Sequence, residues 1–148
     1  MGRRRKAREA AVQYHFWRDV HHGVGPEQLD DFWNFCPVKP NVRDFAQPLI
    51  EGMVAHLDEI DDRIRKYCEN YEFNRIAPVD RNVLRLAIYE MLYRDDIPPV
   101  VSIDEAIELA KTFGGPDSGR FVNGILDRVK KDLTRPLREA VAKQEPAE

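Results

Sequence analysis

The sequence predicts an all-α protein that folds as one domain. Three observations support this prediction. No segment shows the sustained apolar–polar alternation of a half-buried strand, apolar residues recur at helical spacing along most of the chain, and breaks rich in proline and glycine separate these stretches. With 148 residues, 43% of them hydrophobic, the chain is long enough to bury one shared core. No run approaches the ~18 apolar residues of a membrane span, so we expect no membrane association.

The first helix is expected over residues 3–19. At 100° per residue, one arc of this helix is small and apolar and the adjacent arc is basic. The first arc contains Ala7, Ala10, Ala11, Tyr14 and Trp17, and the second contains Arg4, Arg8, His15 and Arg18.

Further apolar stripes predict the remaining helices in order. They run over residues 42–57, 57–71, 84–92, 103–113 and 122–133. We expect Asn41 to cap the first of these, Ser102 with Glu105 to form a capping box, and Asp117 and Ser118 to cap the last. Breaks at residues 23–26, 37–40, 77–78, 97–99 and 114–116 leave about seven helices.

The break at residues 77–78 divides the predicted domain, residues 1–143, into two helical groups. The N-terminal group covers about residues 1–77 and the C-terminal group about residues 78–143, around a continuous core. Residues 144–148 are small and polar, and we expect a frayed tail there.

Charge is distributed unevenly along the chain. The formal net charge is −3, but the first eight residues carry +5 and the remainder carries −8. A basic segment on an acidic body is typical of contact with nucleic acid or another anionic surface, and a solvated tail is the alternative. The two cysteines, Cys36 and Cys68, are too few and too far apart for a disulfide scaffold or a cysteine zinc site. Together with the absence of a signal-like apolar segment, they favour a reducing cytoplasm.

Two stretches are candidates for nucleic-acid contact. Arginines held on a helix can bind phosphates through bidentate contacts, and aromatic rings can stack on unpaired bases. The first stretch supplies Arg3, Arg4, Arg5, Lys6, Arg8, Gln13 and Phe16, and the second supplies Asp117, Arg120, Phe121 and Asn123. Phe16 and Phe121 have packing in the core as their alternative, and Asp117 would repel nearby phosphates.

Signals for catalysis are poor. His21 and His22 lack the spacing of a metal-binding helix motif, and the glycines at 23 and 25 lack the third glycine of a nucleotide-binding turn. We therefore expect a protein that is not an enzyme and that uses no cofactor.

Several motifs together resemble the NusB family of bacterial transcription antitermination factors. They are the arginine-rich run at 3–13, Asp-Arg-Asn-Val-Leu-Arg-Leu-Ala-Ile-Tyr-Glu-Met at 80–91, Ile97-Pro98, Ser-Ile-Asp-Glu-Ala-Ile-Glu-Leu-Ala-Lys-Thr-Phe-Gly at 102–114, and Ser118 with Phe-Val-Asn-Gly-Ile-Leu-Asp at 121–127. Residues 21–41 and those beyond Asp132 match no pattern of the family.

The resemblance implies two small helical bundles and binding of boxA-type leader RNA from ribosomal operons. It also implies a partner, the ribosomal protein NusE, followed by other Nus factors and RNA polymerase. In the family, the arginine-rich start is implicated in RNA contact, and the region of Asp80, Arg81, Leu84 and Tyr89 in binding NusE.

Three alternatives stay open from the sequence. The chain could be related to the RNA-binding part of a ribosomal-RNA cytosine methyltransferase, or be a pure protein-interaction adaptor. A homodimer that covers the RNA site is also open.

Overall fold

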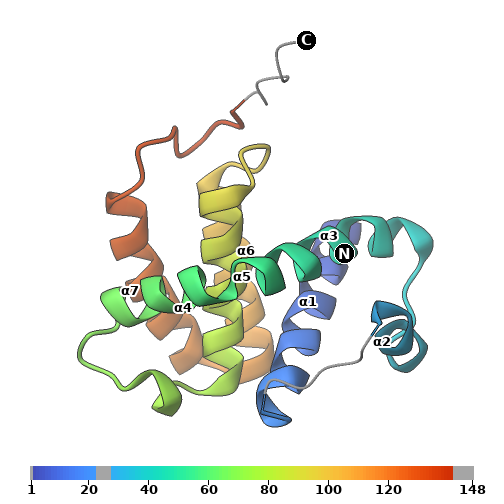
Figure 1. The fold of residues 1–148 in the computed structure, drawn as a ribbon. Coiled ribbons are helices and arrows are strands. Elements are labelled where there is room, and N and C mark those ends of the chain that lie inside the picture. Colours follow the sequence, from blue (N-terminus) through green and yellow to red (C-terminus); the bar gives the residue numbers. More distant parts are fainter. Residues whose placement is uncertain (1, 23–27, 142–148) are drawn as a thin grey trace.

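Seven α-helices and one short 3-10 helix build the structure, and no strand occurs in residues 2–22 and 28–141, the residues that the computed structural model describes. The helices are α1 (Arg3–Val20), α2 (Leu29–Phe35), α3 (Pro40–Ala55), α4 (Leu57–Tyr67), α5 (Pro78–Tyr93), α6 (Pro99–Gly114) and α7 (Pro116–Lys131), with the 3-10 helix at Phe73–Arg75. Figure 1 shows α2 at the outer edge beside α1, on the side away from α7. The all-α prediction is confirmed.

The central element is α5, which packs against α1, α3, α4, α6 and α7. Its large apolar side chains are buried on nearly all sides, as expected for a helix that other helices surround. Leu84, Leu86, Ile88 and Met91 are all less than 2% exposed. Because α5 contacts helices from both halves of the chain, the core is continuous, and the division at residues 77–78 stays a prediction.

Prolines, rather than polar caps, begin four of the helices. Pro40, Pro78, Pro99 and Pro116 occupy the first helical position, where a missing N–H costs nothing and the fixed φ suits a helix. The expected caps at Asn41, Ser102, Asp117 and Ser118 were therefore wrong, because each lies inside its helix and the cap residues form no side-chain cap bond. Ser102 Oγ instead donates to Glu90 Oε1 at 2.7 Å.

A tight corner joins α6 to α7. Gly115 has φ = 94°, a left-handed conformation that favours glycine. A Cβ on Gly114 would lie 2.3 Å from Ser118 Oγ, so this residue must also be small. The corner places the beginning of α7 directly beside the end of α6.

Arg135 holds the segment after α7 against the loop between α5 and α6. Its guanidinium donates to the backbone carbonyls of Met91, Arg94, Asp95 and Ile97 at 2.7–3.2 Å. These carbonyls include ones that the end of α5 leaves without helical partners. The predicted frayed tail at 144–148 and the predicted break at 23–26 lie outside the described residues. No helix within the described ranges has both the length and the apolarity to cross a bilayer.

Candidate nucleic-acid interface

The beginning of α1 presents an exposed basic cluster, which we call the arginine patch and define as Arg3, Arg4 and Lys6. All three side chains belong to exposed residues, and none forms an ion pair within the described parts of the chain. Arg5 lies beside them but forms a two-bond pair with Glu105 of α6, at 2.8 and 3.1 Å. The Arg5 side chain is 37% exposed. The patch therefore offers three unpaired cations on one helix end.

Arg8 was expected to contact RNA, and the structure corrects this expectation. The residue is 2% exposed, and its guanidinium donates two hydrogen bonds to Glu90 of α5, at 2.8 and 2.9 Å. Glu90 is 1% exposed and also accepts the bond from Ser102. Arg8 thus anchors α1 to α5 and presents no free edge to a phosphate.

The ring of Phe45 in α3 packs against Arg4 of the patch. The guanidinium of Arg4 lies 4.8 Å from the centre of its ring, that of Arg94 lies at 5.2 Å and that of Arg8 at 5.5 Å. Contacts of this kind are attractive and hold a cation over the ring face. The phenyl ring therefore orients Arg4 before any ligand arrives.

A second candidate region lies at the beginning of α7. Arg120 is exposed and pairs with Asp117 one turn earlier, and Asn123 is exposed to solvent. Phe121 is half-buried, and its ring meets that of Tyr71 at 82° with 5.3 Å between the centroids. Phe121 is thus partly a packing residue, while Arg120 and Asn123 face solvent.

The structure does not bring the two candidate regions into direct contact. The arginine patch lies near Glu105 in α6, whereas α7 begins beside Gly114 at the end of that helix. Nine residues of helix span about 14 Å. A ligand that contacts both regions must therefore reach from α1 to α7.

The expected partner residues on α5 lie mostly inside the protein, which corrects that expectation. Leu84 is fully buried, and Asp80 and Tyr89 are no more than 9% exposed. Arg81 donates to Asp19 of α1 at 3.0 Å and to the carbonyls of Phe73 and Ile76. None of the four forms an accessible surface for a partner.

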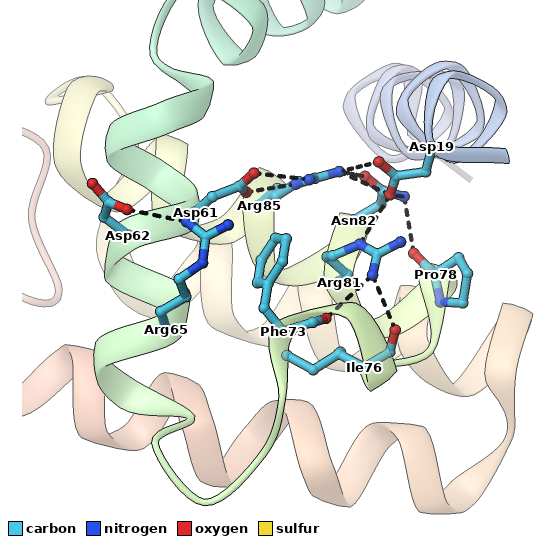
Figure 2. A network of polar contacts seen from close by, with 10 residues as sticks. All are labelled: Asp19, Asp61, Asp62, Arg65, Phe73, Ile76, Pro78, Arg81, Asn82 and Arg85. Atoms are coloured by element: carbon cyan, nitrogen blue, oxygen red, sulfur yellow. Dashed lines mark hydrogen bonds and ion pairs between the residues drawn. The ribbon is translucent and has the colours of Figure 1, made fainter. Parts of the chain in front are cut away.

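Figure 2 shows the polar network to which Arg81 belongs. Asp19 accepts hydrogen bonds from Arg81, Asn82 and Arg85, and Arg85 also donates to both carboxylate oxygens of Asp61 in α4, at 2.7 and 2.9 Å. The network joins α1, α4 and α5 and has a structural role.

His15 lies next to this network, fully enclosed. Burial, with a smaller contribution from the positive charge of Arg85, lowers the pKa of His15 to about 3. The ring is neutral at neutral pH, so His15 adds no charge to the basic arc that the sequence predicted.

Comparison with known proteins now identifies the family. The model of the NusB family matches residues 5–131. The chain belongs to the NusB family. The transcription antitermination protein NusB of Methylacidiphilum infernorum is 44% identical over 133 residues, which cover 89% of this chain and 93% of that protein. The protein of the same name from Myxococcus xanthus is 44% identical over 141 residues, covering 92% and 100%.

Solved NusB structures share the fold. NusB from T. maritima is 42% identical with a TM-score of 0.76, and the match covers 93% of each chain. A crystal structure of NusB and NusE in complex with double-stranded RNA contains a chain that is 26% identical, with a TM-score of 0.79, covering 88% of this chain and 98% of that one. These matches confirm the resemblance that the motifs indicated.

In this chain, Gln13 and Phe16 belong to an apolar pocket rather than to the arginine patch. The pocket has a volume of about 590 Å³ and lies between α1, α2, the start of α5 and the end of α6. Its exposed rings, which we call the aromatic surface, are Phe16, Trp17, Phe35 and Phe113. Gln13 at its edge accepts a weak hydrogen bond from the Cys36 thiol.

Sequence reasoning missed Phe45, Tyr71 and the aromatic surface. Phe45 was assigned only to a helical stripe, and its contacts with three arginines depend on tertiary packing. The aromatic surface had one available signal: Phe16 and Phe113 fall at or near predicted helix ends, where large apolar side chains are often left uncovered. Phe35 ends α2, a helix for which the sequence showed no apolar stripe. Tyr71 carried no signal beyond its place at the end of a stripe.

Proposed function

We propose that the protein is an RNA-binding transcription antitermination factor, which binds boxA-type leader RNA together with NusE and acts by binding rather than by catalysis. The relatives are named as transcription antitermination proteins, and a solved relative is bound to NusE and RNA. The observation that carries the proposal is the arginine patch. Three unpaired cations are clustered on a protein whose net charge is otherwise acidic.

The salt dependence of RNA binding tests the patch. Each phosphate that a cation neutralises on single-stranded RNA contributes about −0.7 to the slope of log K against log salt concentration. Replacement of Arg3, Arg4 and Lys6 by glutamine should weaken boxA binding and make the slope less steep by about 2.

A control variant removes the same charge elsewhere. Arg75, Lys131 and Arg138 are exposed and lie outside both candidate regions, so their replacement by glutamine should leave the slope nearly unchanged. Equal losses in the two triple variants would show that only net charge matters. Equal affinity of the unchanged protein for boxA and scrambled RNA, with and without NusE, would refute the proposal.

The aromatic surface is the proposed docking site for NusE. Phe35 is 89% exposed, and Phe16, Trp17 and Phe113 are each 38% exposed, although apolar rings of this size are normally covered. The surface is separate from the arginine patch, so that one protein can hold RNA and a protein partner at once. When NusE and RNA bind the same protein together, the assembly has a higher affinity for RNA than the isolated protein has.

Substitution of one ring tests the docking site. Phe16→Glu should weaken NusE binding while leaving RNA binding by the isolated protein unchanged. Val101→Glu is the control, since Val101 of α6 is equally exposed, at 39%, outside the surface. If Phe16→Glu instead dissociates a dimer and leaves NusE affinity unchanged, a second copy of the chain is the occupant.

We further propose that the assembly forms in the bacterial cytoplasm, where other Nus factors and RNA polymerase join it. Purification of the tagged protein from cells that transcribe ribosomal operons should recover NusE and RNA polymerase. Treatment with ribonuclease should release the polymerase, if leader RNA links the two.

A further inference from the structure

A notch on α7 lies beside the second candidate region. It has a volume of about 250 Å³, and Tyr71, Arg120, Phe121, Gly124 and Arg128 line most of it. Residues 120, 124 and 128 are spaced four apart, so they lie along one face of the helix. Two arginines thus flank a glycine on an exposed helical face.

Gly124 has no packing role within the described structure. A Cβ placed on it would meet no heavy atom within 4 Å, in contrast to Gly52, Gly114 and Gly119, where a neighbour lies closer than 3.0 Å. Glycine is also among the poorest helix formers. The backbone at this position is therefore bare and accessible, although an alanine would suit the helix better.

The groups around Gly124 match the chemistry of a nucleotide. Among the described residues, Arg120 forms only the exposed pair with Asp117, and Arg128 donates to the Tyr67 carbonyl at 3.0 Å. Tyr71 is 58% exposed while its ring stays fixed against Phe121. Guanidinium groups bind phosphates, and a fixed, exposed aromatic ring is a platform on which an unpaired base stacks.

We propose that the notch binds one unpaired nucleotide of the RNA. The base stacks on Tyr71, and the sugar–phosphate chain passes over Gly124 between Arg120 and Arg128. This inference rests on the proposed function and extends it, because it assigns a stacking platform and a backbone passage to residues outside the arginine patch. It also gives a reason for a glycine in the middle of α7.

Gly124→Ala separates binding from stability. The variant should unfold at a temperature about 2 to 4 °C higher, because the helix gains a better helix former without a clash. Its affinity for boxA RNA should fall about fivefold or more. The added methyl group blocks the passage of the sugar–phosphate chain over position 124, and one stacked base is lost with it. Thr112→Ala, at an exposed position of α6, is the control, which also improves a helix position and should leave RNA affinity unchanged.

Tyr71→Ala and Tyr71→Phe provide the second test. Loss of the ring should weaken RNA binding about fivefold or more, whereas phenylalanine keeps the ring and should bind normally. If the arginine-patch variant loses affinity while both Gly124→Ala and Tyr71→Ala bind like the unchanged protein, the notch is not a nucleotide site and the proposed function stands. If the unchanged protein does not prefer boxA RNA, both proposals fail.

Discussion

Replacement of Arg8 should cost stability rather than RNA affinity. Arg8→Met leaves the Glu90 carboxylate, 1% exposed, with the Ser102 hydroxyl as its one remaining partner among the described residues. Removing one member of a buried ion pair costs about 3 to 5 kcal/mol. Domains of ordinary stability have a free energy of unfolding of about 5 to 15 kcal/mol, so this loss removes a large share of it.

The double variant Arg8→Met/Glu90→Gln tests the reason for the loss. It removes the unpaired charge and keeps an acceptor for Ser102, so it should recover at least about 2 kcal/mol. Urea unfolding followed by circular dichroism measures the free energies.

RNA titration completes the test under conditions in which each variant is folded. Arg8→Met should bind boxA RNA like the unchanged protein. Arg4→Met should have a free energy of unfolding within about 0.5 kcal/mol of that of the unchanged protein, and it should bind RNA more weakly. The reasoning is refuted if Arg8→Met is as stable as the unchanged protein but loses RNA affinity.

Three further outcomes are expected. Asp117→Asn should strengthen RNA binding about two- to fivefold at matched salt, because it frees Arg120 from an exposed ion pair, and unchanged or weaker affinity would remove Asp117 from the site. His15 is neutral in the folded state down to its pKa of about 3, whereas the unfolded chain takes up a proton below about pH 6.5. Stability should therefore fall as the pH decreases, by about 2 kcal/mol between pH 7.5 and 5, and urea unfolding of His15→Gln should lack this part of the slope. Gly52→Ala should lower the free energy of unfolding by about 1 to 3 kcal/mol, because its Cβ would lie 1.9 Å from the Tyr89 hydroxyl, and an unchanged midpoint would contradict that contact.

The helices were predictable because their information is local. The apolar stripes at residues 42–57 and 103–113 were found by spacing alone, and both became helices. The errors occurred at the helix starts. Asn41 and Ser102 suggested caps near the helix starts. Pro40 and Pro99, one and three residues earlier, already fit the first helical position, so each helix begins before the expected cap.

The candidate site was less predictable because its chemistry depends on distant partners. Arg4 and Arg8 are one helical turn apart and fall on the same predicted arc, yet only Arg4 reaches solvent. The difference comes from Glu90, which is 82 residues away from Arg8 in sequence. Helical geometry predicted that Arg4 and Arg8 lie on one side of α1. It could not predict which of the two is buried against α5.

Arg5 shows how burial divides a run of cations between structure and binding. Arg5 and Arg8 both form two-bond pairs with a glutamate, yet the side chain of Arg5 is 37% exposed and that of Arg8 is 3% exposed. An exposed ion pair contributes about 0 to 1 kcal/mol to stability. A charge-assisted contact with a phosphate can contribute more than this to binding. An RNA phosphate can therefore take Arg5 from Glu105, whereas taking Arg8 would leave a buried carboxylate unpaired at several times that cost. The salt slope of RNA binding should accordingly include Arg5 together with the arginine patch and exclude Arg8.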